Sequence, residues 1–598
     1  MNDTPGNIAR RALARWLGMG ALALAGLQLP AGAQAKCELK VAELPVKMVG
    51  VRAIATVEIN GTPVPLMVDT GAFFSFLTPA AAAQLKLHLR SLPPDVRMTG
   101  IAGKVDTARL TRVEHLKMAG SDMPSMEFIV GGNEMGSGTM GILGLNILSF
   151  ADTEYDLAHG MIRLVVPSDD CEKSDMAYWA HDAPVSMVDK EMPSLDAAKG
   201  VRAEVQLNGH AVTALFDSGA TTVVSLHAAH AAGLKDADMT PAGFAYGAGS
   251  GKTGYWTASF DTVKLGGETV RNNRLGIGDF DSDDFDMLLG IDFFLSHRIY
   301  MSKQQPRVYF TYNGGPVFAH NVDAPASSAD AGSASADTLT ADELARRGAA
   351  SLSRGSLAAA LQDLDRACAM APGDASCFAT RAAVHLARRE RELALADLDT
   401  ALRLDPGLSD ARLQRVSLHA RGERELALDD LSALDRSLAP QSQMRLAMAN
   451  VYTDLGLGAQ ALAQWNLWIA AHPNELMLER GYDGRCLARV ELGVDLDKAL
   501  DDCNEALAAD SKNPAYASHR GWLWLRQGKL DKALADFDHA LAGKSNLASA
   551  LYGRGEVHLR LGQAALGEAD LGEARQAQPD IDAEIRRRGL PLAEEAAR

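Results

Sequence analysis

The sequence Asp69-Thr70-Gly71-Ala72 returns almost unchanged as Asp217-Ser218-Gly219-Ala220, 148 residues further along the chain. Each copy follows two apolar alternations joined by an Asn-Gly pair, Asn60-Gly61 in the first and Asn208-Gly209 in the second. Asn-Gly between apolar alternations predicts a β-hairpin, because both residues tolerate a positive φ angle. The two Asn-Gly pairs are also 148 residues apart, so hairpin and acidic loop were duplicated together. This duplication predicts an active site between two lobes, each of which supplies one carboxylate.

Two further elements follow each acidic loop. An apolar-apolar-Gly sequence lies at a similar distance from each aspartate, Ile142-Leu143-Gly144 in the first copy and Leu288-Leu289-Gly290 in the second. A glycine-rich hairpin pattern lies between the loop and this element in both copies. A single acidic loop of this kind is common in turns, where the carboxylate caps a backbone amide. The combination in two copies favours a catalytic role over that alternative.

These motifs resemble those of the retropepsin-like aspartic proteases, in the bacterial form that fuses two lobes in one chain. The resemblance covers about residues 41–312 and implies an all-β double lobe of two β-barrels. It also implies that Asp69 and Asp217 form the catalytic dyad. The residues expected to support the dyad, by bonding across the lobe interface or lining its floor, are Thr70, Gly71, Ala72, Ser218, Gly219 and Ala220.

The chemistry of such a dyad explains why both copies are needed. Two carboxyl groups within hydrogen-bonding distance cannot both ionise, so they share one proton and titrate as a unit. The ionised partner takes a proton from a water molecule that attacks the scissile carbonyl, and the protonated partner donates its proton. We expect no metal, covalent intermediate or organic cofactor, and activity at acidic to mildly acidic pH.

The glycine-rich hairpins are interpreted as flaps that close over a substrate and exclude water. For the first hairpin an ordinary surface hairpin is an equal alternative. The second hairpin is followed by Tyr255 and Trp256 and is the better flap candidate. Counted from each aspartate, Ser75 aligns with Val223, which indicates that the lobes have diverged. The flap candidates are Gly100, Ile101, Gly103, Gly247, Gly249 and Gly251.

Composition excludes several other classes of function. The formal net charge of −17 argues against nucleic acid as a partner, since phosphate binding requires basic patches. The acidic cluster at 279–286 lacks the spacing of a helix-loop-helix calcium site and is interpreted as a solvated loop. The six cysteines form no CxxC pair, so we expect disulfides and no zinc site. The connectivity stays open: Cys368–Cys377 and Cys486–Cys503 are possible pairs because each is close in sequence, and Cys37–Cys171 is possible because the two residues bracket the first lobe.

The N-terminus has the three-part pattern of a secretory signal. Arg10, Arg11 and Arg15 precede an apolar stretch, and Ala33-Gln34-Ala35 follows it. We therefore expect residues 1–35 to be removed on export, and the mature chain to be periplasmic or secreted in a Gram-negative-type bacterium. Whether export uses the general or the twin-arginine route stays open. The apolar stretch is short for a membrane span, so no transmembrane segment is expected in the mature chain.

The C-terminal half repeats at intervals close to 34 residues. Pro372, Pro406, Pro440 and Pro473 each end an Ala/Leu-rich helical run. This pattern resembles the tetratricopeptide repeat (TPR), with about six units. The domains expected are a first lobe at 41–166, a connector at 167–184, a second lobe at 186–312, a flexible linker at 318–338 and an all-α TPR solenoid at 339–585.

Together these features predict an exported aspartic endopeptidase whose repeats bind a protein or peptide, either a partner or the substrate. The rival hypothesis is a catalytically idle peptide-binding scaffold of the cell envelope. The two intact acidic loops argue against it, since a pure binding protein has no physical reason to retain both. A further alternative pairs lobes from two chains, but the connector is long enough for pairing within one chain.

Overall fold

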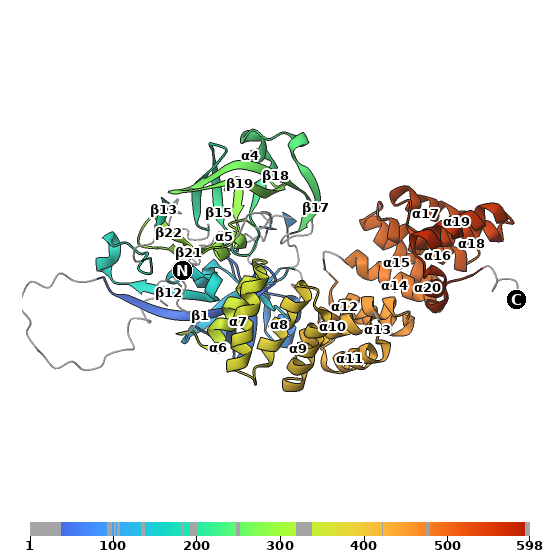
Figure 1. The fold of residues 1–598 in the computed structure, drawn as a ribbon, viewed down its shortest axis with the longest axis horizontal. Helices are drawn as coiled ribbons and strands as arrows, with labels where there is room; N and C mark the ends of the chain where they lie inside the picture. Colours follow the sequence, from blue (N-terminus) through green and yellow to red (C-terminus); the bar gives the residue numbers. More distant parts are fainter. Residues whose placement is uncertain are drawn as a thin grey trace, which may run out of the picture.

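The computed structural model describes residues 37–92, 99–100, 103–104, 108–132, 138–180, 184–189, 200–246, 252–318, 338–420, 422–473, 475 and 478–592. Two β-barrel lobes make up the N-terminal half, and a chain of helices follows them (Figure 1). The first lobe and its neighbouring segments contain β1 (Leu39–Val49), β2 (Arg52–Ile59), β3 (Thr62–Val68), β4 (Phe76–Leu77), α2 (Pro79–Gln84), β5 (Leu89–Ser91), β6 (Thr99–Gly100), β7 (Gly103–Lys104), β8 (Arg109–Met118), β9 (Ser121–Val130), β10 (Gly141–Leu143), α3 (Leu145–Leu148), β11 (Asp152–Asp156), η1 (Leu157–His159), β12 (Met161–Pro167) and η2 (Asp169–Lys173).

The second lobe repeats this order of elements. It contains β13 (Ser186–Asp189), β14 (Arg202–Leu207), β15 (His210–Phe216), β16 (Val223–Ser225), α4 (Leu226–Ala231), η3 (Asp236–Asp238), β17 (Thr240–Tyr246), β18 (Lys252–Leu265), β19 (Glu268–Gly278), β20 (Met287–Leu289), α5 (Ile291–Ser296), β21 (His297–Met301) and β22 (Arg307–Tyr312).

The duplicated Asn-Gly pairs form the expected hairpins. β2 pairs with β3 around Asn60-Gly61, and β14 pairs with β15 around Asn208-Gly209. The φ angles are 49° and 83° in the first turn and 50° and 84° in the second. Positive φ at both central residues twists the hairpin in the sense that the flanking strands require. Both hairpins therefore deliver their second strand to the acidic loop in the same orientation.

Each apolar-apolar-Gly element forms a short central strand behind its acidic loop. β10 runs parallel to β3 and antiparallel to β4, and β20 stands in the same relation to β15 and β16. All residues of β10 and β20 are buried, so both faces of these strands belong to the core. β10 and β20 therefore pair with the C-terminal ends of β3 and β15, directly before the acidic loops.

One sheet joins the two lobes. Its strands lie in the order β13-β22-β21-β11-β12-β1, and β11 pairs with β21 across the boundary between the lobes. The pairing joins Tyr155 to Ile299 and Thr153 to Met301. The lobes therefore associate within one chain through main-chain hydrogen bonds, which fixes how their acidic loops face each other.

The helical half contains seven helix pairs and a short final helix among the described residues, one pair more than the sequence period suggested. Its fifteen helices resemble a TPR solenoid. They are α6 (Ala341–Ser353), α7 (Leu357–Met370), α8 (Ala375–Ala387), α9 (Arg391–Leu404), α10 (Ser409–His419), α11 (Arg424–Ser437), α12 (Met444–Asp454), α13 (Gly458–Ala471), α14 (Leu478–Leu492), α15 (Leu496–Ala509), α16 (Pro514–Arg526), α17 (Leu530–Gly543), α18 (Ala548–Arg560), α19 (Ala564–Ala577) and α20 (Ile581–Arg587).

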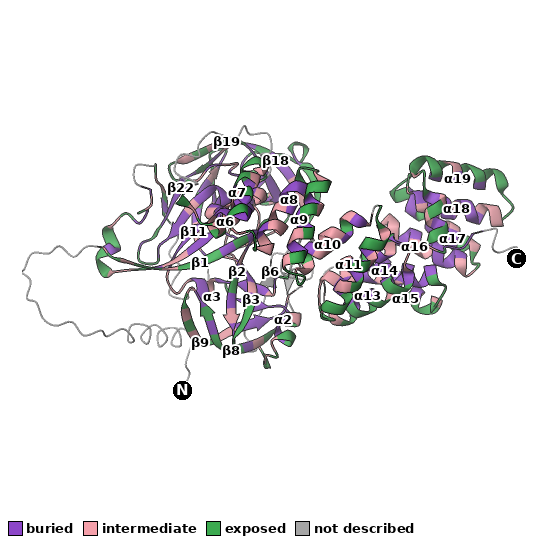
Figure 2. Ribbon diagram, turned by 60° about the horizontal axis from the view of Figure 1, so that its bottom comes forward, coloured by how far each residue is buried: buried purple, intermediate pink, exposed green. Residues whose placement is uncertain are grey.

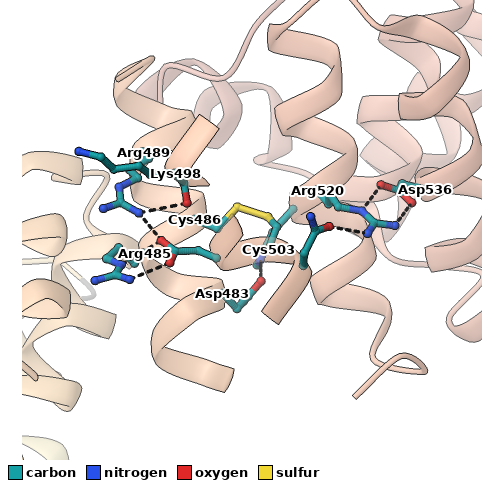
Figure 3. Close-up of a disulfide and its surroundings, with 11 residues drawn as sticks. Asp483, Arg485, Cys486, Arg489, Lys498, Cys503, Arg520 and Asp536 are labelled. Carbon is teal, nitrogen blue, oxygen red and sulfur yellow. Dashed lines mark hydrogen bonds and ion pairs between the residues drawn. A yellow bond between two sulfur atoms is a disulfide. The ribbon is translucent and has the colours of Figure 1, made fainter. Parts of the chain in front are cut away.

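A repeated arginine–aspartate pair ties the two helices of most repeats together. Arg520 binds both carboxylate oxygens of Asp536 at 2.7 and 2.8 Å, and Arg485 binds Asp502 in the same way (Figure 3). Paired, two-pronged contacts of this kind are the geometrically specific form of the ion pair. The same pair recurs as Arg347–Asp363, Arg381–Asp397, Arg415–Asp430 and Arg554–Asp570.

The first repeat packs onto the lobes. Ala349 and Ala350 of α6 are buried in the same apolar cluster as the cores of both lobes. The side chain of Arg346 covers Gly160, and Lys47 of β1 donates a 2.5 Å hydrogen bond to Ser376 Oγ at the start of α8. The first repeats therefore lie against the lobes, and the last repeats extend away from them (Figures 1 and 2).

Three disulfides join Cys37 to Cys171, Cys368 to Cys377 and Cys486 to Cys503, which are the three pairs considered from the sequence. The last of them links α14 to α15 (Figure 3). Among the described residues, no helix combines the length and the apolar character that crossing a membrane requires. Most of the expected linker and the N-terminal 36 residues lie outside the described ranges, although Phe318, at the start of that linker, is buried in the core of the lobes.

Candidate active site

The two acidic loops meet at the boundary between the lobes. Asp69 directly follows β3, and its N–H donates to Leu143 O of β10 at 3.1 Å. Asp217 directly follows β15, and its N–H donates to Leu289 O of β20 at 2.9 Å. Each aspartate is therefore anchored through its own main chain to the central strand behind it.

The hydroxyls of Thr70 and Ser218 exchange hydrogen bonds across the boundary. Thr70 Oγ1 donates to Phe216 O at 2.7 Å and accepts from Ser218 N–H at 3.0 Å. In return, Ser218 Oγ donates to Val68 O at 3.1 Å and accepts from Thr70 N–H at 3.2 Å. Both hydroxyls are buried, so these four bonds form in a setting where an unpaired polar group is costly. They fix the spacing between the two loops.

Main-chain N–H groups orient both carboxylates. Gly71 and Ala72 donate to Asp69 Oδ1, each at 2.9 Å, and Gly219 donates to Asp217 Oδ1 at 2.9 Å. The glycines also lie directly against the carboxylate of the other lobe. A Cβ on Gly71 would lie 2.4 Å from Cγ of Asp217, and one on Gly219 would lie 2.3 Å from Cγ of Asp69. Only glycine leaves room for the two carboxylates to approach each other.

Burial and proximity shift the titration of the pair. Burial, followed by the charge of Asp217 and the hydrogen bond between the carboxyls, holds the pKa of Asp69 well above its usual range. Burial also raises the pKa of Asp217, while the N–H groups of Gly219, Gly71 and Ala220 and the hydrogen bond from Asp69 oppose the rise. The close approach of the two carboxyls and the raised pKa values of both therefore favour one proton shared between them.

Further polar side chains behind each loop hydrogen-bond to the apolar-apolar-Gly element, and they correct the alignment of the two copies. Ser75 Oγ accepts from Gly144 N–H at 2.9 Å and donates to Asn146 Oδ1 at 2.7 Å. Thr222, rather than Val223, does the same in the second lobe. The expected alignment of Ser75 with Val223 was wrong because the first loop is one residue longer, with Phe73 and Phe74 where the second has Thr221.

The contacts of Thr222 show how closely the supports correspond. Its Oγ1 accepts from Gly290 N–H at 2.9 Å and donates to Asp292 Oδ1 at 2.6 Å. Asn146 and Asp292 both stand two residues after the glycine of the apolar-apolar-Gly element. The supports are thus duplicated, with an amide in the first lobe and a carboxylate in the second.

Sequence reasoning missed Ser75, Thr222, Asn146 and Asp292 as supporting residues. The signal available was the polar residue at a fixed distance after each apolar-apolar-Gly element. Tyr155 was missed too: it is buried on β11, and its pKa is raised by burial and, to a lesser extent, by the charge of Asp69. No sequence pattern marks Tyr155, because its place depends on the sheet that joins the lobes.

The flap candidates are described only in part. Gly100 and Gly103 pair with each other in the short hairpin β6–β7. Ile101, Gly247, Gly249 and Gly251 lie outside the described residues. In the second lobe β17 and β18 pair from Thr240–Thr257 to Tyr246–Lys252, so the strands leading to that hairpin are formed. Among the described residues, no group of three or more His, Cys, Asp or Glu side chains is arranged to hold a metal ion.

Comparison with known families assigns the lobes. The family model described as aspartyl protease matches residues 55–147 and, separately, residues 203–293. The two ranges contain the two acidic loops and the two apolar-apolar-Gly elements. The two lobes are aspartyl protease-like domains. Since the matched ranges make up less than a third of the chain, the assignment concerns the aspartyl protease-like lobes and not the helical half.

Solved structures with similar folds exist for both halves. A tetratricopeptide repeat protein from Parabacteroides merdae ATCC 43184 is 18% identical, covers 42% of this chain and 98% of its own, and gives a TM-score of 0.34. An aspartic proteinase from Irpex lacteus is 12% identical, covers 46% and 97% of the two chains, and gives a TM-score of 0.30. At such scores the likeness supports no argument about activity or partners. No curated protein matches the sequence.

Proposed function

We propose that this chain is an exported aspartic endopeptidase that hydrolyses peptide bonds with the dyad Asp69–Asp217. The observation that carries the proposal is the crossed packing of the loops, in which each glycine lies against the opposite carboxylate. A binding module has no need for two closely packed carboxyls with raised pKa values at one point. The three disulfides are compatible with the export that the N-terminal signal pattern predicts.

The proposed mechanism uses the two carboxyls in different protonation states. Asp217, ionised, accepts a proton from a water molecule as its oxygen attacks the scissile carbonyl carbon. Asp69, protonated, donates its proton to the carbonyl oxygen, which becomes a hydroxyl of the tetrahedral intermediate. The intermediate collapses as a proton passes from Asp217 to the amine nitrogen and one from the hydroxyl returns to Asp69. The dyad then holds one proton again.

The pH range of the activity follows from the directions of the two shifts. The mechanism requires one proton on the pair, so the rate falls when the pair loses that proton at high pH or gains a second at low pH. Because burial raises the pKa values of both groups, the active range should extend to higher pH than two ordinary aspartates would allow.

The repeats are proposed to bind a protein or peptide, as substrate or partner. Their support is the array of helix pairs, since solenoids of this kind present an extended concave surface. The first repeat shares an apolar core with the lobes, so a molecule bound to the neighbouring repeats would be held close to the cleavage site.

The decisive experiment is cleavage of a complex peptide library by the mature chain from acidic to neutral pH, read by mass spectrometry. Asp69→Asn and Asp217→Asn should each lower the rate by ~10²–10⁴-fold or more, the usual contribution of a general acid or base. Asp261→Asn is the matched control, because Asp261 is exposed on β18 and the next residue, Thr262, bonds to Asn208 at the end of the hairpin opposite Asp217. Cleavage that survives in both dyad variants, or a folded parent that cleaves nothing, would overturn the proposal.

A further inference from the structure

The last described residues of the chain do not continue the solenoid. In a solenoid each repeat contacts only its neighbours, so a further helix should touch the preceding pair alone. Instead, α20 and the residues after it contact four helix pairs. α20 has 7 residues, whereas the helices of the seven pairs have 11 to 15. Figure 1 shows α20 close to α14 and α16, beneath the array.

Polar contacts trace the path of this segment across the repeats. A Cβ on Gly456, just after α12, would lie 2.9 Å from Cγ of Arg587. Arg588 binds Glu491 near the end of α14 at 2.5 Å. Arg526, the last residue of α16, donates to Gly589 O, and Arg560, the last residue of α18, donates to Leu592 O at 3.0 Å. The segment therefore crosses the C-terminal ends of the first helices of four consecutive pairs.

Apolar contacts accompany these polar ones. Ile581 and Ile585 are completely buried, and Leu590 is 2% exposed. They belong to the same apolar cluster as residues of α14, α16 and α18, including Trp522. The spacing of the isoleucines places both on one face of α20, and the chain is no longer helical at Leu590. This is how an amphipathic segment occupies a groove.

Arg526 and Arg560 bind main-chain carbonyls of the segment rather than its side chains. Arg526 and Arg560 occupy equivalent positions 34 residues apart, and each donates to a carbonyl of the segment. A guanidinium that binds a carbonyl accepts any residue there, so specificity rests on the aliphatic side chains and on the cation that meets Glu491. Another segment with these features would satisfy the same groove.

We propose that the ends of α12, α14, α16 and α18 form a binding groove for a protein segment, and that residues 581–592 are an internal ligand that a partner segment displaces. The partner carries two aliphatic residues four positions apart on a helical turn, then aliphatic residues in extended chain, with a cation between them. This deepens the partner-binding role proposed for the repeats and is independent of the protease chemistry.

The test uses a labelled synthetic peptide with the sequence of residues 578–592 and the full chain carrying Asp69→Asn, so that the probe is not cleaved. Adding Arg588→Glu places a negative charge against Glu491 and Glu584 and weakens the internal ligand. When the internal segment occupies the groove, the apparent affinity for the probe equals the intrinsic affinity multiplied by the fraction of chains in which the groove is open. Arg588→Glu increases that fraction, so this variant should bind the probe at least ~10-fold more tightly. Further substitution with Arg526→Ala and Arg560→Ala should abolish that binding.

A second measurement needs no destabilising variant. Excess probe added to the Asp69→Asn chain should accelerate amide hydrogen exchange of residues 581–592, because the probe displaces them. A probe carrying Ile585→Asp should have no such effect. The proposal is overturned if the probe binds no form of the chain, if its binding is indifferent to Arg526 and Arg560, or if Arg588→Glu merely lowers the unfolding temperature without exposing a site. Peptide-library cleavage by the parent chain is a separate readout, so either proposal can fail alone.

Discussion

The hydroxyl of Thr70 in the first lobe donates a 2.7 Å hydrogen bond to the carbonyl of Phe216, the residue that precedes Asp217 in the second lobe. Ser218 returns the same bond to Val68, the residue that precedes Asp69. Each lobe therefore holds the main chain from which the other lobe's carboxylate extends. The distance between the carboxylates depends on these two hydroxyls as much as on the aspartates themselves.

Replacing Thr70 with valine should uncouple the loops with almost no change in side-chain volume. The variant leaves Phe216 O without its donor and Ser218 N–H without its acceptor, and we expect it to cost about 1–3 kcal/mol of unfolding free energy. Cleavage should fall by ~10²-fold, since a displacement of about 1 Å is enough for that loss. Thr70→Ser keeps the hydroxyl and is the matched control. Denaturant unfolding and kcat/KM measure both effects, and equal behaviour of the two variants would contradict the role given to the hydroxyl.

Adding a single methyl group to Gly219 should separate the dyad. Its Cβ would lie 2.3 Å from Cγ of Asp69, closer than any real contact of this kind, so the Asp69 carboxyl must move. We expect Gly219→Ala to lower kcat/KM by ~10²-fold or more because the carboxyls lose their mutual geometry. Gly267→Ala in the same lobe is the control, since its Cβ would meet only Ser186 Oγ at 3.6 Å. An active Gly219→Ala enzyme would show that close approach of the carboxyls is not needed.

The duplicated loops, hairpins and central strands could be predicted because each is a local pattern that occurs twice. The turns at Asn60 and Asn208 could be predicted from residue type alone. The alignment of Ser75 failed because counting from the aspartates allows no gap, whereas the loops differ by one residue. Ser75 and Thr222 are equivalent because each hydroxyl accepts a hydrogen bond from the N–H of the glycine in the apolar-apolar-Gly element of its own lobe.

Features that join distant parts of the chain escaped prediction for a different reason. The pairing of β11 with β21 brings Tyr155 beside Ile299, and neither strand carries a motif that specifies its partner. In the same way, Ile581 and Ile585 have the spacing of any repeat helix, and only tertiary contacts distinguish α20 from the next unit of the array. Local periodicity fixes an element's type but not the surface that it covers.

Ser75 offers a test of the duplicated support. Ser75→Ala removes the acceptor for Gly144 N–H and the donor to Asn146, both in the buried interior of the first lobe. We expect a loss of about 1–3 kcal/mol of unfolding free energy. Ser75→Thr reproduces the residue that the second lobe uses and should retain most of the stability. Thermal and denaturant unfolding measure the unfolding free energy of both variants. A threonine variant as unstable as the alanine variant would argue against the equivalence of Ser75 with Thr222.

The raised pKa of Asp69 predicts that removing its charge stabilises the fold at neutral pH. A carboxyl whose pKa is higher in the folded than in the unfolded chain contributes favourably below its unfolded pKa of about 3.9, and that contribution is lost as the pH rises through the folded pKa. Asparagine cannot ionise and so avoids the loss.

The unfolding free energy of Asp69→Asn, relative to the parent, should therefore increase as the pH is raised from about 4 to about 8, a range that begins near the unfolded pKa. Asp261→Asn, at an exposed position, should show no such trend. Denaturant unfolding at several pH values provides the comparison. A variant that becomes less stable than the parent at neutral pH would mean that the fold favours the ionised carboxylate, and the shared-proton arrangement would then be wrong.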